Sequence, residues 1–220
     1  MVNHKETVGI IGLGKLGICF ALNLERNGYF IIGSDINEQH VQSINSKTLT
    51  SHEPLVEEYL LNATDVHATT DIHSVLNSDS KIIFIAVATP STDDGRYDHY
   101  QIDAVIKEII AFGKQAETRT VVVMATTMPG YCDQVASELE TLNYHVVYNP
   151  GFVAQGAIIE DQQDPGRVLI GGVQEAAIKK VKEVYVKMSR NLPVFCEMNR
   201  LSAEICKIAS NCFLTSNPIK

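Results

Sequence analysis

Short apolar segments alternate along the chain with longer segments whose apolar positions recur at helical spacing. The short segments predict strands, at residues 7–11, 30–34, 81–87, 120–125, 145–148, 167–170 and 193–196. The longer segments predict helices, at residues 15–27, 38–46, 54–62, 71–76, 100–115, 131–142, 174–188 and 201–214. Strongly apolar strands separated by helices are typical of a parallel sheet that is covered on both faces. The pattern therefore predicts an α/β fold with a doubly wound, mainly parallel sheet.

The last predicted helix, residues 201–214, differs from the others because its apolar face has no predicted neighbour. Its apolar residues follow helical spacing, and the sequence ends six residues after the helix. A helix of this kind is expected to begin a larger unit, since its apolar face needs a partner. We therefore expect one domain over residues 1–199. Residues 200–220 are expected to start a central helical domain whose remainder is absent.

The composition narrows the class of protein. The chain has 220 residues, 45% of them hydrophobic, and a formal net charge of −8 from 18 Lys+Arg against 26 Asp+Glu. This balance is typical of a soluble folded domain, and the lack of a basic run argues against a nucleic-acid partner. The longest apolar stretch, residues 82–88, is far shorter than the roughly 20 residues that span a bilayer.

The five cysteines are scattered along the chain and have no CxxC spacing. This pattern is typical of reduced thiols rather than of a disulfide framework or a zinc site. The N-terminus has no signal-peptide pattern. We therefore expect a cytoplasmic location, no membrane association and no metal ion.

A glycine-rich loop directly follows the first predicted strand. It reads Gly12-Leu13-Gly14-Lys15-Leu16-Gly17 and opens a predicted helix, and Asp35 then stands at the end of the second predicted strand. In such a loop the first glycine permits a tight turn, the second lets the backbone approach a pyrophosphate, and the third permits close packing. An acid at the end of the next strand accepts hydrogen bonds from a ribose 2′-hydroxyl and repels a 2′-phosphate. These residues predict a dinucleotide site that binds NAD.

Two threonines follow the next predicted strands. Thr89 comes after the most apolar strand of the chain, and Thr126 follows the strand after it. The carboxyl ends of parallel strands meet at one edge of the sheet, where ligands bind. We therefore expect both threonines at the cofactor site, although each by itself also fits an ordinary turn residue at a strand end.

The order of these and later motifs resembles the UDP-glucose/GDP-mannose dehydrogenase family, the UDP-sugar 6-dehydrogenases. The resemblance covers nearly the whole chain, and its later motifs are more specific than the glycine loop. These later motifs are Glu53-Pro54, residues 87–90, Asp94-Gly95 with Asp98, residues 126–130, 149–156 and 164–172, and Ser202-Ala203-Glu204 with Lys207 and Asn211.

The resemblance implies a Rossmann-like NAD-binding domain of an enzyme that oxidises the C6 alcohol of a UDP-sugar to a carboxylate. The reaction would pass through a cysteine-bound thiohemiacetal and thioester. The resemblance also implies that Lys207 and Asn211, which share one helical face, stabilise the oxyanion, and that Thr126 orients a catalytic water. The implied partners are a nucleotide-sugar substrate and, where the central domain is present, a second copy in a homodimer.

Two positions depart from the family pattern. Gly151 and Gln155 stand where the family has two carboxylates. The second carboxylate is the family's candidate general base for thioester hydrolysis, and an amide can orient a water but cannot take its proton. The family's nucleophilic cysteine belongs to a segment beyond residue 220. The chain therefore matches the family pattern at the residues for hydride transfer and departs from it at those for acyl transfer. Gln155 is still predicted to be a residue of the catalytic site.

Two alternatives remain open. A β-hydroxyacid dehydrogenase would have a similar glycine loop and the same helical lysine and asparagine, but its pattern does not explain residues 149–156 and 164–172. A non-catalytic NAD-binding module would keep the dinucleotide fold and lose its chemistry. The missing carboxylates and the missing cysteine favour this second alternative, since fold alone does not imply function.

Overall fold

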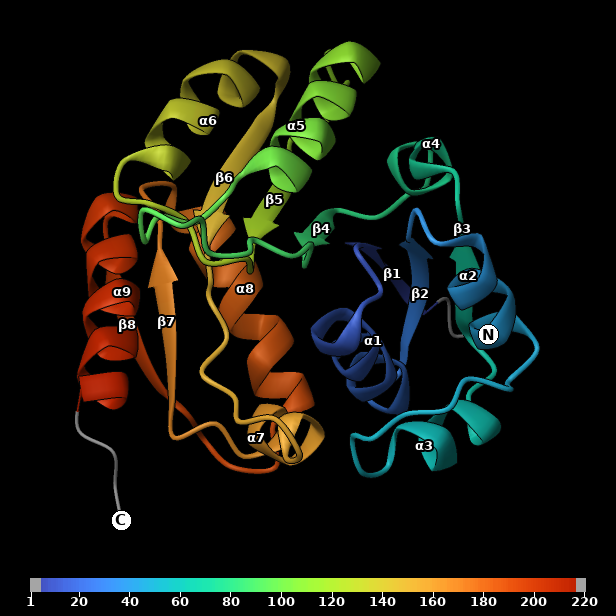
Figure 1. Cartoon of the computed structure of the whole chain (residues 1–220). Coiled ribbons are helices and arrows are strands. Elements are labelled where there is room, and N and C mark those ends of the chain that lie inside the picture. Colours follow the sequence, from blue (N-terminus) through green and yellow to red (C-terminus); the bar gives the residue numbers. More distant parts are fainter. Residues whose placement is uncertain (1–4, 217–220) are drawn as a thin grey trace.

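The structure, a computed structural model, describes residues 5–216. An eight-stranded sheet forms its centre, with the spatial order β3-β2-β1-β4-β5-β6-β7-β8 (Figure 1). The strands are β1 (Glu6–Ile11), β2 (Tyr29–Ser34), β3 (Val66–Thr69), β4 (Ile82–Ile85), β5 (Arg119–Val123), β6 (Tyr144–Tyr148), β7 (Arg167–Gly171) and β8 (Val194–Met198). The helices are α1 (Lys15–Arg26), α2 (Glu38–Asn45), α3 (Val56–Asn62), α4 (Ile72–Leu76), α5 (Tyr100–Phe112), α6 (Tyr131–Leu139), α7 (Ile158–Gln163), α8 (Glu175–Met188) and α9 (Arg200–Ser216). A 3₁₀ turn, η1 (Glu140–Leu142), follows α6.

The sheet is doubly wound. From β1 the chain builds outward through β2 to β3, then returns to the other side of β1 with β4 and continues outward to β8. Neighbouring strands pair in parallel except β6 and β7, which meet antiparallel at Tyr148 and Gly171. The order therefore reverses between β1 and β4, and a crevice opens at their carboxyl ends, where α/β sheets bind ligands. The predicted fold class is confirmed.

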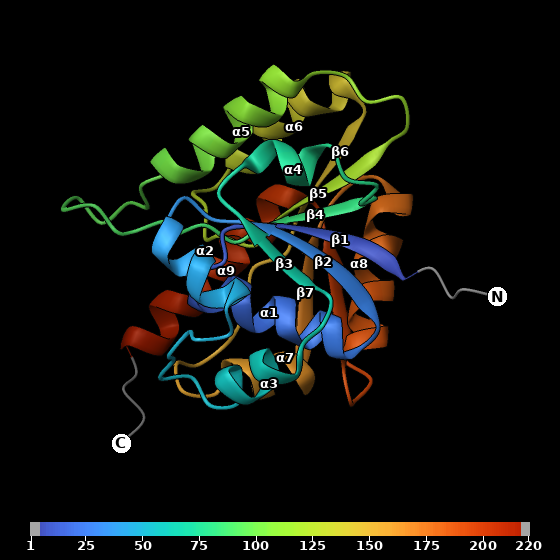
Figure 2. The same ribbon diagram turned by 90° about the vertical axis from the view of Figure 1, so that its right-hand side faces the viewer.

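Strand β4 shows why the core forms on both sides of the sheet. Its side chains alternate between two apolar clusters, and all four are fully buried. Phe84 packs edge-on against Phe20 of α1, with ring centroids 4.8 Å apart. Ile83 and Ile85 belong to the opposite cluster together with Ile109 of α5. Figure 2 shows α1 on one face of the sheet and α5 and α6 on the other. A strand buried on both faces reads as a continuous apolar run, which is the signal that predicted it.

The structure contains two elements that the apolar pattern did not predict, β3 and α7. Strand β3 is short and lies at the edge of the sheet, where none of its side chains is fully buried. Helix α7 turns amide side chains toward the core, because Gln162 and Gln163 both hydrogen-bond to the buried Asn23 of α1. Neither element has the apolar periodicity on which the prediction relied.

Helix α9 packs against β6, β7 and α6 through the start of its length. A Cβ on Gly171 would lie 2.7 Å from the Cβ of Ala203, so glycine permits this close approach. On the other side of the helix, Ile205 and Phe213 are exposed. The division into residues 1–199 and 200–220 stays a prediction, and its outermost residues, 1–4 and 217–220, lie outside the described residues. Neither α9 nor another helix within residues 5–216 is long and apolar enough to cross a bilayer.

Candidate functional site

The glycine loop joins β1 to α1 in a geometry that two of its glycines make possible. Gly12 has a φ of +93°, and a Cβ there would lie 2.9 Å from the backbone carbonyl carbon of Ala86. A Cβ on Gly17 would lie 1.9 Å from the Gly12 carbonyl oxygen. At Gly14, apart from the residues adjacent to it in the chain, no residue in the range 5–216 has an atom within 4 Å of the Cβ position. Two glycines therefore serve the turn and its packing, and the third leaves open space for a ligand.

The N-terminus of α1 begins at this open space. Gly14 is the N-cap and has no side chain with which to satisfy the first turn, and that turn contains no acidic residue. The first N–H groups of a helix have no acceptor within the helix, and the helix dipole adds partial positive charge. The exposed Lys15 contributes a full positive charge. This end of α1 is therefore suited to a pyrophosphate.

Asp35, directly after β2, is tied to the glycine loop. Its Oδ2 accepts a hydrogen bond from the Leu13 N–H at 2.9 Å, and its Oδ1 accepts one from the Asn37 N–H at 2.9 Å. His40 Nε2 lies 2.7 Å from the Leu13 carbonyl oxygen. The carboxylate thus holds the glycine loop, which is a role that the sequence did not predict, in addition to its predicted role as the acceptor for a ribose.

A cavity of about 450 Å³ opens between the glycine loop and α5. Gly12, Gly14 and Asp35 line one part of it. Ile72 and Val105 are among the apolar residues that line the remainder. A mostly apolar cavity lined by two carboxylates, Asp35 and Glu108, is suited to an adenosine, because the ring needs apolar contact and the ribose hydroxyls need an acceptor.

The two predicted threonines lie farther along the same edge of the sheet. Both are half-buried, Thr89 after β4 and Thr126 after β5. The cavity lining includes Val87 and Ala88 but neither threonine. The structure therefore brings the glycine loop and Asp35 together in one cavity, with the threonines outside it.

The segment between β6 and α7, residues 149–157, is anchored at both ends. Asn149 Oδ1 accepts a hydrogen bond from the Tyr185 hydroxyl at 2.8 Å. Near the other end, the Gly156 N–H lies 2.9 and 2.8 Å from the two carboxylate oxygens of the buried Glu53. Hydrogen bonds to a buried carboxylate are strong, so Glu53 fixes the path of this segment.

Three predicted site residues meet at this segment. The Lys207 ammonium donates to the Gly151 carbonyl oxygen at 2.7 Å and lies 4.5 Å from the centre of the Phe152 ring. From the other side, Lys15 Nζ lies 3.4 Å from Gln155 Oε1. The segment therefore connects the N-terminal end of α1 with Lys207 of α9, for which the sequence predicts a role in the reaction.

Lys207 and Asn211 both point toward the domain, as their shared helical face predicts. Burial lowers the pKa of the Lys207 ammonium from its ordinary value. Asn211 Nδ2 donates to the Tyr97 hydroxyl at 3.2 Å, in the connection between β4 and α5. Within residues 5–216, no carboxylate oxygen lies within 4.0 Å of Lys207 Nζ. The ammonium is thus held by a carbonyl oxygen and an aromatic face.

The connection from β5 to α6, which carries Thr126, is held from two sides. On one side, His99 Nε2 accepts a hydrogen bond from the Met128 N–H at 3.1 Å, and burial lowers the pKa of His99, which favours the neutral acceptor form. On the other side, Glu204 of α9 accepts hydrogen bonds from this connection. In the sequence, Glu53 and Glu204 are recognisable only as parts of motifs, because a buried acid has no signal in the apolar pattern.

A doubly wound sheet with a three-glycine turn, an acid after the second strand and a cavity at the reversal of strand order defines a Rossmann-type dinucleotide-binding domain. The family model for the UDP-glucose/GDP-mannose dehydrogenase family, NAD binding domain, matches residues 6–189. The chain belongs to this family, and the cofactor of the domain is NAD. The match favours the predicted resemblance over the β-hydroxyacid dehydrogenase alternative.

Named relatives agree with the family. UDP-glucose 6-dehydrogenase of Rickettsia prowazekii is 27% identical over 214 residues, which cover 95% of this chain and 49% of that protein. The crystal structure of GDP-mannose dehydrogenase from Pseudomonas aeruginosa, a ternary complex, has a TM-score of 0.87 at 27% identity, covering 95% of this chain and 50% of that one. The structure of UDP-glucose dehydrogenase from Pyrobaculum islandicum has a TM-score of 0.83 at 28% identity. The match covers 97% of this chain and 50% of that one. The chain thus spans about half the length of these relatives.

Proposed function

We propose that this chain is the NAD-binding domain of an oxidoreductase that converts the C6 alcohol of a nucleotide sugar, resembling UDP-glucose, toward the uronic acid. The proposal depends chiefly on one arrangement, the meeting of Lys15, Gln155 and Lys207 at residues 151–155. This segment contacts Lys207 at Gly151 and Lys15 at Gln155, which supports a reaction centre beside the N-terminal end of α1. A substrate held there would lie against a bound cofactor.

The side chains on α9 would stabilise charge during the oxidation. Bound NAD supplies the hydride acceptor. When the substrate alcohol loses its proton, the Lys207 ammonium and the Asn211 amide are two donors on one helical face for the resulting oxyanion. Lys207 needs no reorganisation for this task, because its position is already fixed against Gly151.

Thr126 and Gln155 are proposed to act on water rather than on the sugar. In the acyl-transfer half of the reaction, Thr126 would orient a water by its hydroxyl group. Gln155 would hold a water by hydrogen bonding without accepting its proton. We therefore propose that thioester hydrolysis is slow in the complete protein.

The remaining proposals concern the protein around this domain. The exposed apolar residues Ile205 and Phe213 on α9 support a central helical domain that continues from residues 200–220. With that domain present we propose a homodimer, in the cytoplasm, with a nucleotide sugar as the small-molecule partner. A non-catalytic NAD-binding module stays the second candidate, and the replacement of both motif carboxylates by Gly151 and Gln155 favours it.

Two assays separate these candidates. In the first assay, titration calorimetry of this chain should show binding of NAD. In the second, the proposed longer protein, which includes the central domain, should form NADH with a UDP-sugar and not with 3-hydroxyisobutyrate. NAD binding without NADH from any nucleotide sugar would favour the non-catalytic module. NADH formed from the hydroxy acid alone would favour the β-hydroxyacid dehydrogenase.

In the complete protein, Gln155→Glu should speed formation of the acid product. A general base contributes about 10²-fold or more, and the new carboxylate would stand where Gln155 now contacts Lys15. The measurement is the rate of uronic acid formation against NADH release in single-turnover samples. Gln134→Glu, on the exposed side of α6, adds the same charge elsewhere and should leave the rate unchanged. Equal rates in both variants would contradict the assignment of Gln155.

A further inference from the structure

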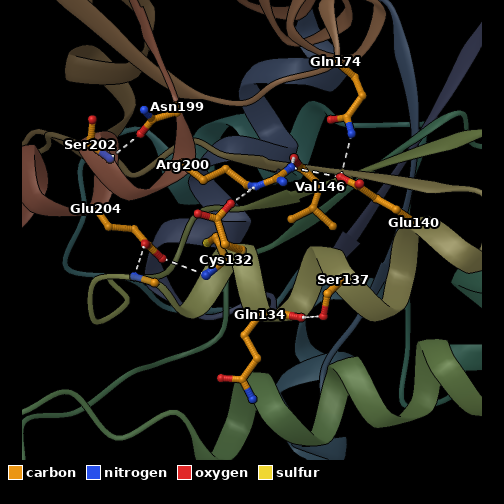
Figure 3. Close-up of polar contacts among 12 residues, drawn as sticks. Cys132, Gln134, Ser137, Glu140, Val146, Gln174, Asn199, Arg200, Ser202 and Glu204 are labelled. Carbon is orange, nitrogen blue, oxygen red and sulfur yellow. Dashed lines mark hydrogen bonds and ion pairs between the residues drawn. The ribbon is translucent and has the colours of Figure 1, made fainter.

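Glu204 is a fully buried carboxylate on α9, one helical turn before Lys207. It accepts hydrogen bonds from the Thr127 hydroxyl at 2.9 Å, the Gly130 N–H at 2.7 Å and the Cys132 N–H at 2.9 Å. Figure 3 shows the side chain reaching from α9 to the start of α6, beside Cys132. All three donors belong to the connection from β5 to α6 or to the first turn of α6.

The N-terminus of α6 explains why a carboxylate is stable in this buried position. Gly130 is the N-cap of α6 and supplies no side chain, so the first N–H groups of this helix need an acceptor from elsewhere. Glu204 is that acceptor, and the helix dipole favours its negative charge. Burial, together with the neighbouring Glu204, raises the pKa of the Cys132 thiol well above its ordinary value, so this neighbour stays uncharged.

The turn of α9 before Glu204 is fixed as well. The guanidinium of Arg200 donates to Asp133 at 2.7 Å, to Glu140 at 3.0 Å and to the Val146 carbonyl oxygen at 3.1 Å (Figure 3). The side chain of Arg200 is almost fully buried by these contacts. Arg200 and Glu204 therefore both hold the start of α9 against the domain. Of these two residues, Glu204 is the one that contacts the connection carrying Thr126.

We propose that Glu204 is the positioning residue of the reaction centre. One carboxylate holds both the Thr126–Gly130 connection and the turn of α9 that leads to Lys207, and so sets the separation of Thr126 from Lys207. This inference rests on the proposed function, which gives those two residues their roles. An amide at position 204 would keep an acceptor for Thr127 and Cys132 but would turn an N–H₂ donor toward the Gly130 N–H. The three donors thus require a carboxylate.

The test compares Glu204→Gln with Glu197→Gln in this chain. Glu197 is an exposed carboxylate on β8 that pairs with Lys182, so its variant removes the same charge close to α9. Lysine side chains labelled with a stable isotope are titrated by NMR, and Lys207→Arg identifies the signal of Lys207. In the wild type and in the Glu197 variant, the Lys207 signal should give a pKa lower than that of the other lysines. In Glu204→Gln, the pKa of Lys207 should rise toward the pKa of the other lysines. The affinity for NAD should change by no more than about twofold.

The opposite result would overturn the inference. If Glu204→Gln melts at a lower temperature but leaves the Lys207 titration and the amide signals of residues 126–130 unchanged while folded, the residue is only structural. Should Glu204→Gln fail to fold, Thr127→Val removes one donor and keeps the carboxylate. It should shift the Lys207 titration in the same direction by a smaller amount, and no shift would again contradict the inference. Absence of NAD binding by the wild type would instead count against the proposed function, because the titration of Lys207 is measured without NAD.

Discussion

Replacing Gly17 by alanine is expected to destabilise the chain by about 3 kcal/mol. The added Cβ would lie 1.9 Å from the Gly12 carbonyl oxygen and 3.0 Å from its carbon, and both are backbone atoms. Gly12 cannot move aside, because its N–H donates to the Ser34 carbonyl oxygen at 2.8 Å and its Cβ position faces the backbone of Ala86. Urea denaturation followed by circular dichroism measures the loss of stability.

Gly14→Ala is the matched control in the same loop. Apart from the residues adjacent to Gly14 in the chain, no described residue has an atom within 4 Å of this Cβ position, so the free energy of unfolding should change by less than about 0.5 kcal/mol. NAD affinity should nevertheless fall by about tenfold or more, because the methyl group occupies the space through which a pyrophosphate approaches the backbone. A Gly17 variant as stable as the wild type, or a Gly14 variant with unchanged affinity, would contradict these assignments.

Asp35→Ala is expected to lower NAD affinity by about 10- to 100-fold and to reduce the preference for NAD over NADP. A hydrogen bond to a charged group contributes about 1.5–3 kcal/mol, and removing the carboxylate also removes the repulsion of a 2′-phosphate. The loss has a second cause in this structure, because the Leu13 N–H loses its acceptor and the glycine loop is held less firmly. Calorimetric titration with both cofactors gives the affinity ratio.

Glu38→Gln supplies the control for charge. Glu38 lies in the first turn of α2, three residues after Asp35, and is exposed. Its variant removes one negative charge at the same edge of the sheet without touching the loop, so both affinities should stay close to those of the wild type. An Asp35 variant with the same NAD to NADP ratio as the Glu38 variant would show that the carboxylate does not select the cofactor.

Most of the sheet could be predicted from the sequence, because strands buried on both faces appear as apolar runs. Strand β4 is the clearest case, with all four side chains fully buried. Strand β3 was missed because an edge strand needs few apolar residues, and α7 was missed because Gln162 and Gln163 face the core as amides. Edge pairing and buried polar contacts depend on neighbours that are distant along the chain.

That the glycine loop and Asp35 lie together at one cavity could also be predicted, because these residues are close along the chain. Gly12, Gly14 and Gly17 belong to one turn, and Asp35 stands at the end of the next strand. Glu53 could not be assigned in this way. It lies 103 residues from Gly156, the N–H group that it binds, so only the folded chain reveals its role.

The sequence by itself determined the α/β class, the dinucleotide loop and the family, because these depend on short-range patterns of glycine, acid and apolar residues. The tertiary structure alone decided how Lys15, Gln155 and Lys207 come to one segment, and why a buried acid stands at position 204. Hydrogen bonds and burial of charge are properties of surroundings that form only on folding. A buried carboxylate and a solvated one are therefore the same letter in the sequence, and their partners distinguish them.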